Sequence, residues 1–182
     1  KNEYNDLVKK GFDWKPPVIG GPSTGRTIID GEERIMLCAN NYLSMSNHPK
    51  VKQAAIDAVK SHGAGSGSVR PIAGNMDIHN ELEETIARFK NREAALYYQT
   101  GFAVNSGLIP QLAGKNDAII SDQLNHGSII DGVRLSGVKK ENRTIYAHND
   151  MGELEDRLQE ATNKCQKTLV ISDGVFSMDG DI

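Results

Sequence analysis

Three short segments of this sequence combine glycine with side chains that can bind a ligand or move a proton. They are residues 99–102, 122–128 and 173–180. Each segment follows an apolar stretch of strand length. If these stretches are parallel strands of one sheet, the segments share its carboxyl edge, where open α/β sheets bind their ligands. The spacing therefore predicts one ligand site built from three loops.

The segment Thr100-Gly101-Phe102 is suited to a phosphate group. It precedes a predicted helix, whose first N–H groups and positive dipole end would face an anion. Gly101 would let that anion come close to the backbone. The alternative is an ordinary tight turn, because short glycine motifs often match by chance.

His126 and Ser177 each allow two interpretations. His126 either caps the helix that follows it, or presents its imidazole to a planar ligand or to a proton transfer. Ser177 either satisfies nearby backbone groups or donates to a ligand oxygen. The residues alone leave both pairs of alternatives open.

Several common site motifs are absent from the sequence. The glycine-rich run at 63–68 lacks dinucleotide-binding spacing, because the third glycine of that motif would fall on Arg70. There is no P-loop and no Gly-x-Ser-x-Gly hydrolase elbow. There is also no His-Glu-x-x-His and no Cys-x-x-Cys pair, so no metal site is predicted.

The elements that must position these loops follow from the apolar spacing. Helices are predicted at 4–9, 49–62, 78–91, 102–113, 128–135 and 150–161, the last with the capping-box pair Asp150 and Glu153. A hairpin is predicted from 26–30 and 33–38, and strands at 94–98, 118–121, 144–147 and 168–172.

This alternation predicts an α/β fold with a mainly parallel sheet and helices on both faces. We expect residues 1–46 to form an N-terminal arm that carries the hairpin. Residues 47–182 are expected to form part of a larger ligand-binding domain.

Composition excludes several classes of protein. The 182 residues suffice for one domain, and 21 basic against 24 acidic residues leave a formal charge of −3. That balance gives no nucleic-acid footprint. No apolar stretch is long enough to span a bilayer. Cys38 and Cys165 form no disulfide pattern, which favours reduced thiols and a cytoplasmic location.

Five groups of residues together resemble a known family. They are Ala39-Asn40-Asn41-Tyr42-Leu43 with His48-Pro49, residues 62–74, His79-x-x-Leu82-Glu83, residues 124–135, and Asp173-Gly-Val-Phe-Ser-Met-Asp-Gly180. In this order, from about residue 35 to 182, they resemble the α-oxoamine synthases. These are fold-type I pyridoxal-phosphate (PLP) enzymes that join an amino acid to an acyl-CoA with release of CoA.

The resemblance implies roles for particular residues. The backbone of Gly101 and Phe102 would hold the PLP phosphate. His126 would stack over the pyridine ring beside the substrate and act in catalysis. Ser177 would bond the phenolic oxygen of the cofactor, and Asn40 would lie near the substrate entrance. The loop at 65–70 would border the site, and the enzyme would be a homodimer.

Within the family, Val69 stands where the aminolevulinate synthases have threonine, which disfavours a charged acyl tail there. The runs Asn40-Asn41-Tyr42, Val69-Arg70 and 125–131 most resemble the glycine C-acetyltransferases (2-amino-3-ketobutyrate CoA ligases). That resemblance implies glycine and acetyl-CoA as substrates. The alternative is an 8-amino-7-oxononanoate synthase, which uses L-alanine and a pimeloyl thioester. Thr100 and Gly127 depart from the usual serine and alanine.

The resemblance covers about the first half of a family member. The lysine that forms the Schiff base, and the carboxylate that pairs with the pyridine nitrogen, follow later in the family. We therefore expect these 182 residues alone to be inactive. Two other classes stay open: a non-catalytic binding or dimerisation module, and a nucleotide-binding α/β domain.

Overall fold

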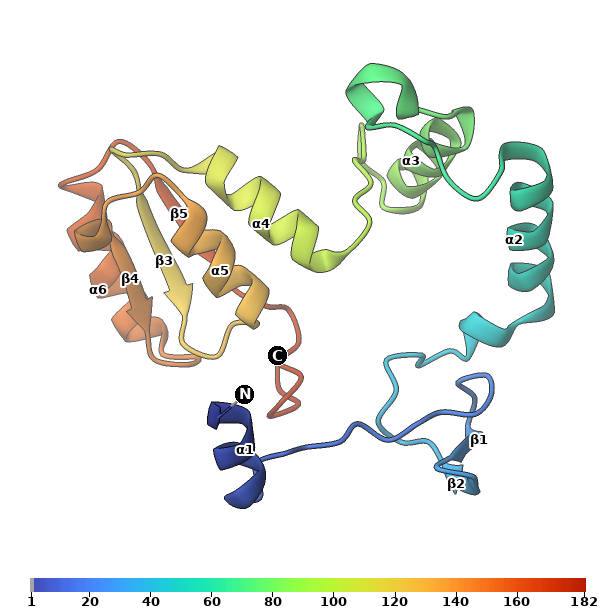
Figure 1. Ribbon diagram of the computed structural model, residues 1–182. Helices are drawn as coiled ribbons and strands as arrows, with labels where there is room; N and C mark the ends of the chain where they lie inside the picture. Colours follow the sequence, from blue (N-terminus) through green and yellow to red (C-terminus); the bar gives the residue numbers. More distant parts are fainter. Residues whose placement is uncertain (1) are drawn as a thin grey trace. The chain divides into compact units, whose positions relative to one another are not determined.

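The computed structural model describes residues 2–182 of the chain (Figure 1). The chain divides into two compact units, one ending at Asn80 and one spanning Glu81–Ile182. The expected boundary between an arm at 1–46 and a domain at 47–182 stays a prediction. Among residues 2–182, no helix has both the length and the apolar character needed to cross a membrane.

The first unit begins with helix α1 (Asn2–Lys9) and a β-hairpin. Strands β1 (Arg26–Ile29) and β2 (Glu32–Ile35) pair antiparallel, which confirms the predicted hairpin. Asp30 and Gly31 form the turn with φ values of 51° and 86°. Two positive φ values match the twist of a two-residue hairpin, and an Asp-Gly pair accepts them readily.

Two helices follow the hairpin, after a short 3-10 turn, η1 (Met45–Asn47). Helix α2 (Pro49–His62) starts with proline, and the ring of His48 accepts a hydrogen bond from the N–H of Lys50. It stops before Gly63, which has a φ of +79°. A π turn, η2 (Arg70–Gly74), then leads to α3 (Asp77–Phe89).

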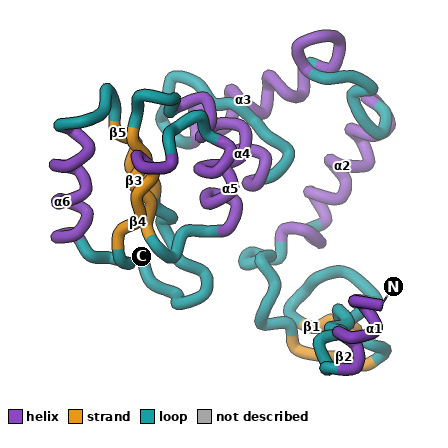
Figure 2. Tube along the Cα trace, turned by 60° about the vertical axis from the view of Figure 1, so that its left-hand side comes forward, coloured by secondary structure: helices purple, strands orange, loops and turns teal. Residues whose placement is uncertain are grey.

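The second unit holds a parallel sheet of three strands in the order β4–β3–β5. The view in Figure 2 shows α4 and α5 on one face and α6 on the other, as the sequence predicts. The elements are α4 (Gly101–Leu112), β3 (Ala118–Asp122), α5 (Gly127–Leu135), η3 (Lys140–Asn142), β4 (Arg143–Tyr146), α6 (Met151–Thr162) and β5 (Thr168–Ile171).

Strand β3 is the centre of the core, and all five of its residues are buried. Successive side chains point to opposite faces. Ile119 therefore packs with Ile109 of α4 and Ile129 of α5, whereas Ile120 packs with Ala161 of α6 on the other face. Burial on both faces explains why the first three residues of the strand, Ala118–Ile120, are all apolar.

The prediction of a strand at 94–98 is wrong. No residue of that segment is paired in a described strand, and the N–H of Tyr97 donates to the Glu83 carboxylate at 2.8 Å. Aromatic and apolar residues favour a strand, but a strand forms only where a neighbouring strand accepts its hydrogen bonds.

The capping box at α6 forms only in part. The Asp150 side chain accepts from the N–H of Glu153 at 2.9 Å, as predicted. The Glu153 carboxylate, however, accepts from the N–H of Ala147 at 2.8 Å. The reason is that the N–H of Asp150 already donates to the Ala147 carbonyl in a turn.

Helices α4 and α5 touch at Gly132, so a side chain there should be costly. A Cβ on Gly132 would lie 2.4 Å from the Asn105 carbonyl oxygen and 2.8 Å from Ile109 Cδ1. We expect Gly132→Ala to lower the free energy of unfolding of the full-length protein by about 1–3 kcal/mol, measured in urea. The control is Gly127→Ala, where a Cβ meets nothing within 4 Å. This variant should raise the free energy of unfolding by up to about 1 kcal/mol. Equal effects of the two variants would contradict this packing.

Candidate active site

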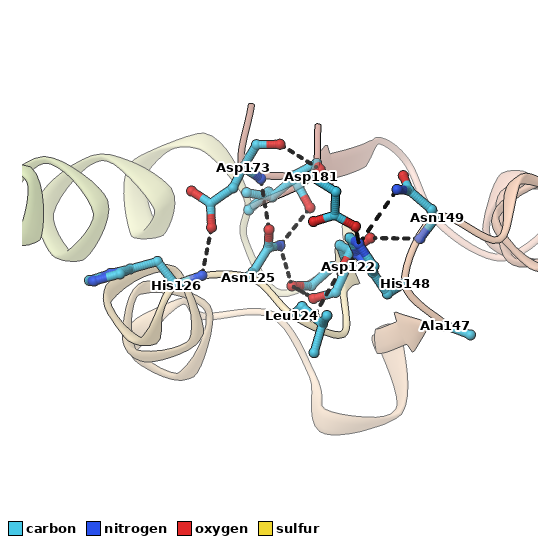
Figure 3. A network of polar contacts seen from close by, with 12 residues as sticks. Asp122, Leu124, Asn125, His126, Ala147, His148, Asn149, Asp173 and Asp181 are labelled. Atoms are coloured by element: carbon cyan, nitrogen blue, oxygen red, sulfur yellow. Dashed lines mark hydrogen bonds and ion pairs between the residues drawn. The ribbon is translucent and has the colours of Figure 1, made fainter. Parts of the chain in front are cut away.

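The site begins at the carboxyl end of β3, where Asn125 joins two strands. Asn125 is buried, and its amide nitrogen donates to the Ser121 hydroxyl at 2.9 Å and to the Ile171 carbonyl at 2.8 Å. Its amide oxygen accepts from the N–H of Asp173 at 2.8 Å. The loop after β3 is therefore fixed to the loop after β5 (Figure 3).

His126 comes next and uses only one side of its ring to cap α5. Nδ1 accepts from the backbone N–H of Ser128 at 3.1 Å and lies 2.7 Å from the Ser128 hydroxyl. An N–H can only donate, so Nδ1 is an acceptor and a neutral ring carries its proton on Nε2. The helix cap and a ligand contact are therefore compatible, because they use different atoms.

A second layer of contacts holds the His126 ring in place. The amide of Asn105, on α4, donates to the Ser128 hydroxyl at 2.9 Å. The N–H of His126 donates to the Asp173 carboxylate at 2.7 Å. Ser128 and Asn105 thus hold the ring and Asp173 holds the main chain of His126, yet the residue remains exposed.

A hollow of about 440 Å³ lies beside His126. Two segments line it, residues 124–127 after β3 and residues 173 and 175–179 after β5. Ser177 is exposed on its wall, and no hydrogen bond of its hydroxyl is found among the described residues. His126 and Ser177 are therefore brought together, whereas their roles stay predictions.

The first turn of α4 offers free backbone donors. The Thr100 hydroxyl caps the helix by accepting from the N–H of Ala103 at 3.0 Å. The N–H groups of Gly101 and Phe102 take part in none of the described hydrogen bonds, and both residues are exposed. Because Asn105 bonds Ser128, the starts of α4 and α5 are neighbours at one end of the sheet (Figure 1).

Asn40 lies in the other compact unit, so its predicted place near a substrate entrance stays a prediction. It is exposed, and its side-chain oxygen accepts from the Tyr42 hydroxyl at 3.5 Å. Within residues 2–182, no three His, Cys, Asp or Glu side chains gather as a metal site would require.

A known family matches most of the chain. The profile described as aminotransferase class I and II matches residues 32–182. The chain belongs to this family. The 8-amino-7-oxononanoate synthases of Alkaliphilus metalliredigens and Thermoanaerobacter pseudethanolicus are each 50% identical to it over 182 residues. These matches cover the whole chain and 45% of each relative, so the chain spans about half the length of the relatives it matches.

Solved structures of this aminotransferase family share the fold. Serine palmitoyltransferase of Sphingomonas wittichii has a TM-score of 0.88 and 32% identity, covering all of this chain and 45% of that one. A variant of the S. paucimobilis enzyme with a bound PLP–myriocin aldimine has a TM-score of 0.89 and 30% identity, with the same coverage. Both enzyme names belong to the α-oxoamine synthases, so the resemblance seen in the sequence is confirmed.

Three residues that organise this aminotransferase-family site were not predicted from the sequence. Asn125 and Asp173 join the two loops, and His148 lies between the carboxylates of Asp122 (3.0 Å) and Asp181 (2.8 Å). The only indication of these residues in the sequence is their position, as polar residues after the ends of predicted strands. Their partners lie far away in sequence, so spacing could not pair them.

The protonation of His148 follows from its two partners. Hydrogen bonds to Asp181 and Asp122 raise the pKa of His148 above its ordinary 6.5. Burial opposes ionisation of Asp122, but the N–H of Leu124 and the His148 ring outweigh it and lower its pKa below 3.8. Stability from His148 is therefore lost as pH rises through the raised pKa, and stability from Asp122 is lost as pH falls through the lowered one.

We expect these ion pairs to give a pH-dependent difference in thermal stability. In the full-length protein, the difference in Tm between the parent and His148→Gln should be largest between about pH 4 and pH 6.5. It should shrink as pH rises through the raised pKa of His148, because the parent then loses the proton that the variant never carried. Thermal unfolding followed by circular dichroism checks this, and a difference that grows with pH would contradict the ion pairs.

Proposed function

We propose that the full-length protein is a PLP-dependent acyltransferase that condenses an amino acid with an acyl thioester. The observation that carries this proposal is the common hollow of the loops after β3 and β5. His126 and Ser177 both line it, and neither Nε2 of His126 nor the Ser177 hydroxyl takes part in a described hydrogen bond. The family membership and the similarity to serine palmitoyltransferase support the same class.

The residues present fit the cofactor. The free N–H groups of Gly101 and Phe102 at the start of α4 suit a phosphate dianion. The exposed ring of His126 offers a flat face for a pyridine ring, and the Ser177 hydroxyl suits a phenolic oxygen. The hollow of about 440 Å³ lies within the range of small-molecule sites.

When bound, PLP supplies an electron sink that stabilises negative charge at the Cα of the amino acid. The residues of this chain bind and orient. Nδ1 of His126 is held by Ser128, so Nε2 is the ring nitrogen left to donate an N–H to a ligand. The start of α4 attracts the phosphate, and the Ser177 hydroxyl orients the edge of the ring.

For the substrates, we propose L-alanine and a pimeloyl thioester, giving 8-amino-7-oxononanoate with release of CO2 and the thiol. The sequence analysis favoured glycine and acetyl-CoA, whereas the relatives at about 50% identity are named 8-amino-7-oxononanoate synthases. The likeness of residues 40–42 and 69–70 to the glycine C-acetyltransferases keeps that reaction as the second candidate. From the family resemblance, we also infer a cytoplasmic homodimer.

Substrate ranking distinguishes the two candidates. We expect full-length protein loaded with PLP to release thiol from pimeloyl-CoA with L-alanine at least about tenfold faster than from acetyl-CoA with glycine. A thiol-reactive dye measures both rates at matched concentrations. The reverse ranking would assign the protein to glycine acetylation, and no release from either pair would reject both candidate reactions.

A variant of His126 separates the helix cap from the ligand contact. Asparagine is among the best N-cap residues, so His126→Asn should keep the free energy of unfolding within about 1 kcal/mol of the parent. It lacks the ring and Nε2, so turnover should fall about 100-fold or more. The control, His126→Ala, should lose both stability and turnover. Parent-like turnover in His126→Asn would rule out the assigned role.

A further inference from the structure

The loop that carries Ser177 is closed upon itself. The N–H of Phe176 donates to the Asp181 carbonyl at 2.8 Å, and the N–H of Gly180 donates to the Phe176 carbonyl at 2.7 Å. Gly180 has a φ of +79°, which permits the tight return. Ser177 therefore sits within a small closed turn, residues 176–181, and its position depends on what holds that turn.

The beginning of the loop is held at Asp173, whose N–H donates to the Asn125 side-chain oxygen and whose carboxylate accepts from the N–H of His126. Residues 174 and 175 then lead away, and both are exposed. The contacts of Asp173 with Asn125 and His126 alone therefore do not set the position of the 176–181 turn.

The end of the loop is held by His148, which follows β4. Its Nε2 lies 2.8 Å from Asp181 Oδ2, and its Nδ1 lies 3.0 Å from Asp122 Oδ1 at the end of β3 (Figure 3). The buried Phe176 ring packs edge-on against the imidazole, with 4.3 Å between centroids. His148 thus touches both the first and the last residue of the turn.

Asp122, His148 and Asp181 form a bridge in which the imidazole lies between two carboxylates. Ionised carboxylates only accept hydrogen bonds, so both ring nitrogens of His148 must donate. Asp122 is held by the N–H groups of Leu124 at 2.8 Å and Asn149 at 3.3 Å, which anchors the bridge to the sheet. Asp181 Oδ1 is buried and has no partner in the part of the chain that the structure describes. Without His148, this partly buried carboxylate would lose its charged partner, and its movement into solvent would therefore be favoured.

We propose that His148 is a positioning residue for the Ser177 hydroxyl. The Asp122–His148–Asp181 bridge and the Phe176 contact hold the 176–181 turn against the sheet, and this sets the place of Ser177 on the wall of the hollow. The inference rests on the proposed function in one respect, namely that Ser177 contacts the cofactor.

Hydrogen exchange of the full-length protein without cofactor tests whether His148 holds the 176–181 turn in place. His148→Gln should raise the exchange rate of the Phe176 and Gly180 amides at least about tenfold, while the amides of α4 stay unchanged. Leu158→Ala is the control, because it opens a cavity beneath α6 and lowers Tm without touching the turn. It should leave the two amides protected. If His148→Gln fails to fold, Asp181→Asn removes the same ion pair at a more exposed position.

A double-mutant cycle on PLP binding, followed by absorbance and titration, tests the link to Ser177. His148→Gln and Ser177→Ala should each weaken PLP binding about three- to tenfold, and the double variant no more than Ser177→Ala alone. Additive losses, or unchanged exchange of the two amides, would overturn the proposal. If the parent binds no PLP, the proposed function fails, and the exchange experiment still decides whether His148 holds the turn.

Discussion

The buried amide of Asn125 joins the ends of β3 and β5, and the arrangement of the site depends on that junction. A strand end leaves backbone groups without sheet partners, and a buried group of that kind is costly. Asn125 satisfies the Ile171 carbonyl and the Asp173 N–H with one side chain. The same contacts that complete the fold therefore bring the His126 and Ser177 loops to one hollow.

Two residues of the candidate site cap a helix and still leave donors for a ligand. His126 caps α5 with Nδ1, and its Nε2 takes part in no described hydrogen bond. Thr100 caps α4 with its hydroxyl, and the next two N–H groups also have no partner among the described residues. A helix start leaves up to four N–H groups unpaired, so a cap that uses one of them still leaves donors for an anion. The interpretations that the sequence left open as alternatives are thus compatible.

Much of the fold follows from local pattern. The apolar run of β3, the proline at the start of α2 and the Asp30-Gly31 turn each act through neighbouring residues, so the sequence predicts them. The segment at 94–98 shows the limit, since a strand depends on a partner that composition does not supply. The Asp122–His148–Asp181 bridge shows the same limit, because its members lie 26 and 33 residues apart. The proposed substrates depend on only a few residues of the sequence. The similarity to named relatives changed that proposal from glycine and acetyl-CoA to L-alanine and a pimeloyl thioester.

The close approach of α4 and α5 at Gly132 links the packing of the fold to the position of His126. With the Asn105 backbone directly against that glycine, a side chain at position 132 would force the two helices apart. Asn105 also bonds the Ser128 hydroxyl, which lies against the His126 ring, so such a separation would move that ring together with the first turn of α5. A glycine that does not line the hollow therefore helps to set the position of a residue that does.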